Sequence, residues 1–205
     1  MNRKEMEREA RKKDILETAM YLFAEKDFHE VTVDEIAERV GLSKGTLYLY
    51  FENKENLFFT IIQEKTRELF GMLREAAGSQ ASFTDRLTDL VRAYLGFFDT
   101  HKSYFKIMHS EKCRLSEDEH YRMHDHAMEA FGTFFQHMTV FVRSGQEEGA
   151  LKQAPPVALA KQLQGMLNAF AFHRTFVGNG DALDDDVRQI VDLFLHGANF
   201  NQDKR

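Results

Sequence analysis

The chain has 205 residues, of which 43% are apolar, with two prolines, one cysteine and a formal net charge of −6. This length allows a sizeable buried core and two structural units, while the acidic balance argues against unspecific affinity for nucleic acids. The single thiol, Cys113, excludes an internal disulfide and fits a reducing cytoplasm, no apolar run approaches the roughly 20 residues of a membrane span, and the charged N-terminus does not form a signal peptide.

The first predicted helix starts at about Arg3 or Glu9 and ends at Glu25, and the pattern of a helix-turn-helix follows in residues 32–54. Thr32 and Glu35 have the spacing of a capping box. The residues after Thr32 form one apolar face at i, i+3, i+4 and i+7, namely Val33, Ile36, Ala37 and Val40. Gly41 stands where this helix must stop, because glycine enters the left-handed conformation without a Cβ clash.

A second helix of this motif is predicted after Ser43, a good N-cap residue. Leu47 and Phe51 share its inner face, one turn apart. No acidic residue occurs between Val40 and Phe51, although a solvated helix normally carries several charges. A recognition helix has this composition, because its N-terminal part enters the major groove of DNA.

The outward residue types of this second helix suit contact with DNA. Gly45 lets backbone approach backbone closely, and Thr46 offers a hydroxyl and a methyl group to base edges. Tyr48 and Tyr50 can donate to phosphate oxygens. Lys44 supplies charge at the helix start, where the backbone amides already favour anions.

The run S-K-G-T-L-Y-x-Y-F-x-N-K-E-x-L, which starts at Ser43, resembles the signature of the TetR family of bacterial transcriptional regulators. The resemblance covers residues 12–58, including the apolar positions of the first helix. It implies DNA binding, with Leu49 at a position that varies among members and so bears on operator choice. We predict these DNA-binding residues: Thr32, Ser43, Lys44, Gly45, Thr46, Tyr48, Leu49, Tyr50 and Lys54.

The charges around this motif are unevenly distributed. Residues 1–60 carry ten basic and thirteen acidic side chains, which is unfavourable for DNA binding. Residues 1–13, however, carry six basic and three acidic side chains, and the acids of the first helix can face away from DNA. Affinity should therefore depend on placed contacts more than on a general positive field.

The remaining sequence is helical throughout, without a strand pattern or a repeat. Helices are predicted over 54–77, 83–99, 102–112, from 116 or 118 to about 145–149, from 155–156 to 178, and over 184–199. The fold class is therefore all-α, with about nine helices. A three-helix DNA-binding domain is predicted at residues 1–54, and a helical ligand-binding and dimerisation domain at 55–205.

Sixteen of the nineteen phenylalanines lie in the predicted second domain, where they cluster. Ordinary core packing explains any one of them, yet aromatic and methionine side chains crowd both faces of the helix predicted over 116–149, which suits an irregular apolar cavity. The TetR resemblance implies an effector pocket in this region, between the fifth, seventh and eighth helices. Its predicted lining is Tyr94, Phe97, Phe98, Met128, Phe131, Phe135, Met138, Phe170 and His173, with His173 or Gln136 as the polar contact.

The last two predicted helices carry regular apolar stripes. Either these stripes cover the core of the chain itself, or they pair with their symmetry mates as a four-helix homodimer core. We favour the dimer, because a protein that reads a palindrome needs two-fold symmetry. The predicted interface residues are Leu159, Leu163, Met166, Val187, Ile190, Val191, Phe194 and Leu195.

Two further features are candidate sites of lower weight. His120 and His124 lie one turn apart and could ligate a metal, but charged flanks favour solvated histidines, so no metal and no cofactor are predicted. Cys113 could sense redox state, although an inert thiol is the simpler reading.

The leading hypothesis is a cytoplasmic, dimeric repressor that a small apolar or aromatic effector releases from a palindromic operator. The alternative is a DNA-binding protein of the same fold that acts in nucleoid organisation or cell division without an effector. An enzyme is not expected, since no nucleophile elbow, phosphate loop or convincing carboxylate pair occurs.

Overall fold

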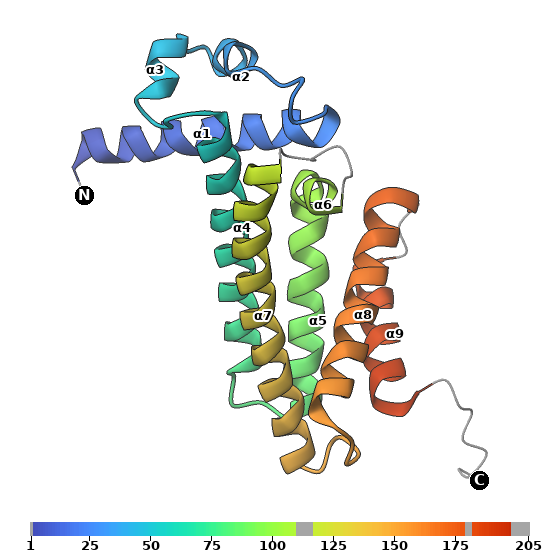
Figure 1. Cartoon of the computed structure of the whole chain (residues 1–205). Coiled ribbons are helices and arrows are strands. Elements are labelled where there is room, and N and C mark those ends of the chain that lie inside the picture. Colours follow the sequence, from blue (N-terminus) through green and yellow to red (C-terminus); the bar gives the residue numbers. More distant parts are fainter. Residues whose placement is uncertain (1, 110–116, 179–181, 198–205) are drawn as a thin grey trace. The chain divides into compact units, whose positions relative to one another are not determined.

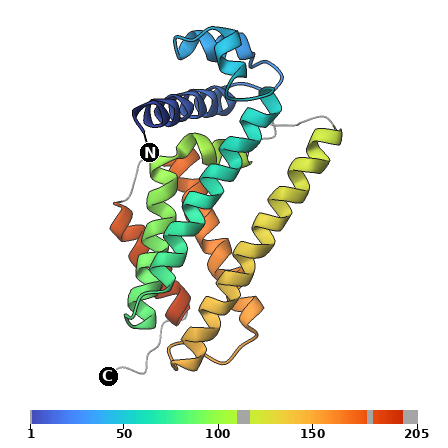
Figure 2. The ribbon, with the colours of Figure 1, turned by 90° about the vertical axis from the view of Figure 1, so that its left-hand side faces the viewer.

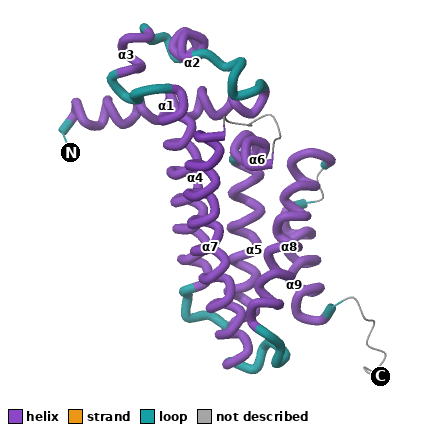
Figure 3. Tube along the Cα trace, viewed as in Figure 1, coloured by secondary structure: helices purple, strands orange, loops and turns teal. Residues whose placement is uncertain are grey.

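The computed structural model describes residues 2–109, 117–178 and 182–197, and side chains are described outside 117–131 (Figure 1). Cys113 and the side chains of His120 and His124 fall outside these residues. Every regular element in the described part of the chain is helical (Figure 3). The predicted all-α fold class is confirmed. No described helix is long and apolar enough to cross a membrane.

The helices follow the predicted order closely. Their bounds are α1 Arg3–Glu25, α2 Val33–Arg39, α3 Lys44–Tyr48, α4 Lys54–Ala77, α5 Phe83–Thr100, α6 Lys102–His109, α7 Glu117–Glu147, α8 Pro156–Phe172 and α9 Leu183–His196. α7 runs as one continuous helix (Figure 2). The predicted last turn of the eighth helix is instead a π-helical turn, η2 His173–Val177.

The chain divides into two compact units. The first comprises residues 1–67 and 101–128, and the second comprises residues 68–100 and 129–205. The predicted domain boundary after residue 54 stays a prediction, since compactness and function need not divide a chain at the same residue.

The turn between α2 and α3 is set by local backbone chemistry. Gly41 has φ +68°, its N–H donates to the Glu38 carbonyl at 3.1 Å, and the Leu42 N–H donates to the Ala37 carbonyl at 2.8 Å. This pair of bonds is a Schellman motif, which needs a left-handed residue. At the start of α2, the Thr32 hydroxyl accepts from the Glu35 N–H at 3.1 Å.

The first unit has an aromatic core beneath this turn. The rings of Phe23, Phe28 and Phe58 lie with centroids 5.1–5.4 Å apart. Leu47 and Phe51 are buried as predicted, at 1% and 2% exposure. The aromatic cluster therefore joins α1 to α4, and burial of Leu47 and Phe51 fixes which face of α3 points inward.

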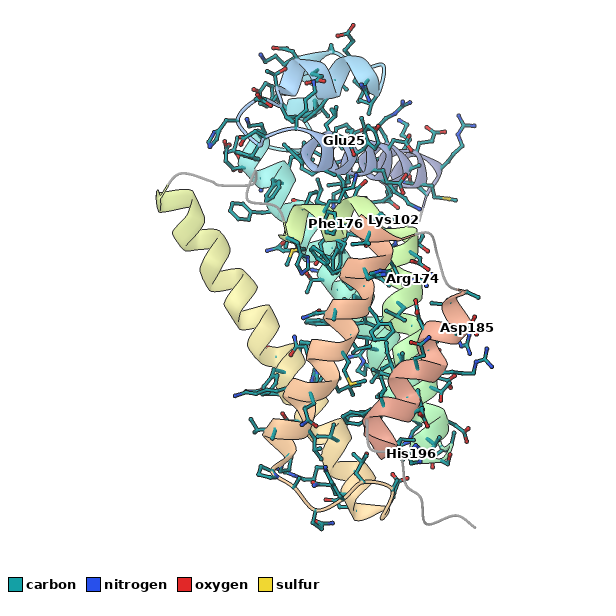
Figure 4. The ribbon with its side chains drawn as sticks, turned by 90° about the vertical axis from the view of Figure 1, so that its right-hand side faces the viewer. Glu25, Lys102, Arg174, Phe176, Asp185 and His196 are labelled. Atoms are coloured by element: carbon teal, nitrogen blue, oxygen red, sulfur yellow. The ribbon has the colours of Figure 1, made fainter. Side chains whose placement is uncertain are left out.

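In the second unit, an arginine links three elements. Arg174 of η2, labelled in Figure 4, donates from Nε and Nη2 to the two carboxylate oxygens of Asp99 on α5, at 2.9 and 2.5 Å. Its Nη1 donates to Asp186 of α9 at 2.5 Å. These bonds, above all the one to Asp99, raise the pKa of the Arg174 guanidinium, so the cross-link stays charged.

Replacing Arg174 with Met should lower the free energy of unfolding by about 3 kcal/mol, because Asp186, whose side chain is only 8% exposed, would lose its charged partner. Urea denaturation measures this loss. Arg188→Met is the control, since Arg188 pairs with Asp185 on the surface and should cost no more than about 0.5 kcal/mol. Equal effects of the two substitutions would contradict a specific role for Arg174.

Candidate DNA-binding site and effector pocket

The recognition helix α3 is held at its start by two hydroxyls. The Ser43 hydroxyl accepts from the Thr46 N–H at 3.1 Å, and it lies 2.9 Å from the Thr46 hydroxyl. Ser43 thus has a capping role in the free protein, as does Thr32 at α2. The Thr46 side chain is half-buried.

The outer face of α3 is left to solvent. Tyr48 is 44% exposed and Leu49 is 74% exposed, the largest value among the exposed large apolar side chains of the described chain. A Cβ built on Gly45 would meet its nearest neighbour, the Ser43 hydroxyl, at an ordinary 3.9 Å. Within the protein there is therefore room for a side chain at residue 45. The glycine fits a close approach of DNA to the backbone at this position.

Lys44, the first residue of α3, is paired in the free protein. Its ammonium lies 2.7 Å from the Asp34 carboxylate of α2, and both side chains are about half exposed. This hydrogen bond raises the pKa of Lys44. A phosphate or base that binds Lys44 must compete with, or share, this carboxylate.

Lys54 has a structural role that the sequence did not reveal. Its ammonium donates to the carbonyls of Phe28 and Val31 at 2.7 and 2.9 Å, and it lies 4.3 Å from the centre of the Phe28 ring. Lys54 therefore ties the start of α4 to the segment between α1 and α2. Its predicted phosphate contact stays a prediction beside this role.

Tyr50, in the segment between α3 and α4, is half-buried. The guanidinium carbon of Arg8 on α1 lies 5.9 Å from its ring centre, within the range of a cation–π contact. Most of the residues predicted to bind DNA thus lie on α3 or just beside it, while Thr32 caps α2 and Lys54 begins α4 (Figure 1).

A pocket of about 320 Å³ lies in the second unit, between α4, α5 and α7. Its walls are mainly apolar, with Phe70, Leu73, Leu90, Phe134, Met138 and Phe141 among them. Arg86, 9% exposed, lies at its wall and donates to the Ala77 carbonyl at 3.1 Å. The same guanidinium pairs with Glu148, so its charge is already balanced.

Among the residues whose side chains the structure describes, this pocket shares only Met138 with the predicted lining. Tyr94, Phe97 and Phe98 are buried against one another instead, with ring centroids 4.9 and 5.2 Å apart, and the Tyr94 hydroxyl donates to Asn168 at 2.5 Å. Other predicted lining residues lie elsewhere: Phe135 and Phe170 are half-buried and His173 is exposed, while the side chains of Met128 and Phe131 fall outside the described residues. The pocket wall that α4 forms was not predicted, although its residues Phe70, Leu73 and Ala77 share one helix face.

Four of the predicted dimer residues serve the core of the chain itself. Leu159, Leu163, Val187 and Ile190 are at most 4% exposed within the single chain. Their place in a dimer interface stays a prediction, because apolar periodicity alone does not distinguish a stripe that covers the core from one that pairs with a second copy. Met166, Val191, Phe194 and Leu195 are half-buried and keep some exposed surface.

Comparison with known proteins decides the family. Residues 15–61 match the model of bacterial regulatory proteins of the tetR family. These residues are a DNA-binding domain of the TetR family. The chain is thus a DNA-binding transcriptional regulator and not an enzyme, and the run from Ser43 lies inside the matched residues.

Relatives extend this likeness beyond the DNA-binding residues. The fatty acid metabolism regulator protein of Bacillus subtilis (strain 168) is 24% identical over 149 residues, 73% of this chain and 75% of that protein. The HTH-type transcriptional repressor KstR2 of Rhodococcus jostii is 27% identical over 188 residues, 91% of this chain and 90% of that protein. The crystal structure of FadR from Bacillus subtilis in complex with stearoyl-CoA has the same fold, with a TM-score of 0.75 at 17% identity, over 91% of this chain and 98% of that one.

Replacing Asp34 with Asn should strengthen binding of this TetR-family regulator to DNA by up to about fivefold, because Lys44 would no longer be shared with a carboxylate. Fluorescence anisotropy with an operator duplex measures the change. Glu38→Gln removes the same charge from an exposed position of the same helix, and it should have a smaller effect. Equal gains would show a general field effect instead of release of Lys44.

Replacing Lys54 with Ala should lower the free energy of unfolding by about 2 kcal/mol, since two carbonyls lose a charged donor. If Lys54 also binds phosphate, the same substitution weakens binding to all sequences and makes the salt dependence of log K shallower by about one. Lys13→Ala, on α1, is the control for both measurements. Unchanged stability would contradict the structural role, and an unchanged salt slope would contradict the phosphate contact.

Proposed function

We propose that this regulator is a repressor that an apolar or aromatic effector releases from a palindromic operator. The observation that carries the proposal is the apolar pocket of about 320 Å³ in the second unit of a chain whose first unit has an exposed recognition helix. In this reading Lys44 and Thr46 lie near base edges, while Tyr48, Tyr50 and Lys54 contact the phosphate backbone.

The pocket lining favours an effector with an apolar body. Aromatic and aliphatic side chains form most of the wall, and the buried Arg86 is already paired with Glu148. A nucleotide or sugar phosphate held wholly inside this pocket would need several uncompensated cations. The structure of FadR from Bacillus subtilis in complex with stearoyl-CoA supports a ligand with a long apolar chain.

We further propose a functional boundary near residue 54, with DNA binding before it, and dimerisation through α8 and α9 after it. The outward face of α8 combines small and aromatic residues, including Gly165, Ala169 and Phe172, which allow a second helix to approach closely. On α9 the partly exposed Leu193 and Phe194 extend this surface. Two copies joined in this way would present two recognition helices to one palindrome.

The alternative is a DNA-binding interaction protein without an effector. It shares the recognition helix, so DNA binding alone does not separate the two functions. Release from DNA by a small molecule does separate them, and a coupling of about 1–3 kcal/mol between the two sites suffices for a switch.

The test starts with selection of bound sequences from a random DNA pool. The selected duplex is then challenged with stearoyl-CoA, free fatty acids and neutral aromatic compounds, and release is followed by anisotropy. Met138→Trp should lower the affinity of any releasing compound, because Met138 is 2% exposed and lines the pocket, while binding of the unliganded protein to DNA stays nearly intact. Release that is equally effective for this variant would contradict the proposed pocket.

Replacing Ala169 with Arg should dissociate the dimer, because a long charged side chain would enter the proposed contact between two α8 helices. Sedimentation velocity at micromolar concentration measures this directly. Ala81→Arg makes the same change at an exposed residue between α4 and α5 and should leave the dimer intact. A wild-type chain that sediments as a monomer would contradict the proposed interface.

A further inference from the structure

α1 extends well beyond the residues that match the TetR family model. The match begins at residue 15, and the buried residues of α1 also begin there, with Ile15. Yet the helix starts at Arg3, after an N-terminal capping box. The Asn2 side chain accepts from the Glu5 N–H at 3.0 Å, and the Glu5 carboxylate accepts from the Asn2 N–H at 2.8 Å. About three turns of helix therefore precede Ile15, the first buried residue of α1 (Figure 1).

Three basic residues of this extension share one side of α1, and Glu7 lies one turn from two of them. Lys4, Arg8 and Arg11 follow each other at i, i+4 and i+7, so they lie on one side of the helix. Within the residues that the structure describes, no carboxylate lies within ion-pair distance of these three. In contrast, Arg3 pairs with Glu7 at 3.0 Å, and Lys13 lies 3.8 Å from Glu17.

Two contacts hold this extension against the rest of the first unit. The Arg8 guanidinium lies 5.9 Å from the centre of the Tyr50 ring, and the Lys12 ammonium lies 2.6 Å from the Glu64 carboxylate of α4. The basic face thus borders the tyrosine that we propose as a phosphate contact. A cation next to a phosphate-binding hydroxyl would meet the same DNA strand.

We propose that Lys4, Arg8 and Arg11 form a second DNA-binding surface, which grips phosphates next to the one at Tyr50. This surface rests on the proposed docking of α3, and its occupant is the backbone of double-stranded DNA. An anionic membrane is the weaker reading, because the large apolar residue exposed on the extension is Met6 alone, too little for insertion. Such a surface lets an acidic protein bind DNA through placed contacts.

The test compares two double variants that each remove two positive charges from α1. Arg8→Gln with Arg11→Gln changes the proposed surface, and Arg3→Gln with Lys13→Gln is the matched control on the other faces. Affinity for the selected operator is measured over a range of salt concentrations. The first variant should make the slope of log K against log salt shallower by about two and weaken binding at least about tenfold for all sequences. The control should keep nearly the wild-type slope.

Three outcomes would overturn the proposal: equal slopes for the two double variants, a wild-type slope for the first variant, or loss of binding to phosphatidylglycerol vesicles without any change on DNA. Circular dichroism checks that both variants keep their helices. Failure of the docking itself is distinguishable, since Thr46→Val would then leave the sequences selected by the wild-type chain unchanged. If Thr46→Val shifts the selection and the first double variant has no effect, only the extension is excluded.

Discussion

The DNA-binding surface depends on α3, a helix that is too short to be stable by itself. α3 has five residues, Lys44–Tyr48, and a helix of this length is unstable in water without tertiary support. Its support comes from burial of Leu47 and Phe51, and from the backbone and side-chain caps at the two ends of the turn before it. The exposed residues of α3 are in place only because these inward residues and the left-handed Gly41 fix the helix direction.

Local chemistry explains why so much of this unit was predictable from sequence. The caps at Thr32 and Ser43, the stop at Gly41 and the buried spacing of Leu47 and Phe51 involve residues at most a few positions apart. The helix bounds of α4 were predicted to the residue, since Asn53 and Gly78 flank one continuous apolar pattern. The function of this unit, DNA binding, was predicted from its resemblance to the TetR family.

The parts that sequence could not predict depend on contacts between distant residues. Lys54 looked like a phosphate ligand, and its bonds to Phe28 and Val31 follow only from the fold. One wall of the pocket belongs to α4, and the apolar periodicity of α4 does not indicate that this face borders a cavity. In sequence, Leu163 and Ile190 fit a dimer stripe and a core stripe equally well. Only the fold shows that both side chains are buried within the single chain. The pairing of Lys44 with Asp34 is a further contact of this kind, because the composition of the chain does not say which charges lie side by side.

The central claim is that burial of the inward residues of α3 places the surface that reads DNA. Operator affinity of Leu47→Ala tests it most directly, at a temperature where circular dichroism shows the other helices intact. Removing this side chain, 1% exposed, costs about 2–5 kcal/mol of packing. The account predicts that binding weakens by about 30-fold or more. Affinity within about twofold of the wild-type chain, with helices intact, would contradict it.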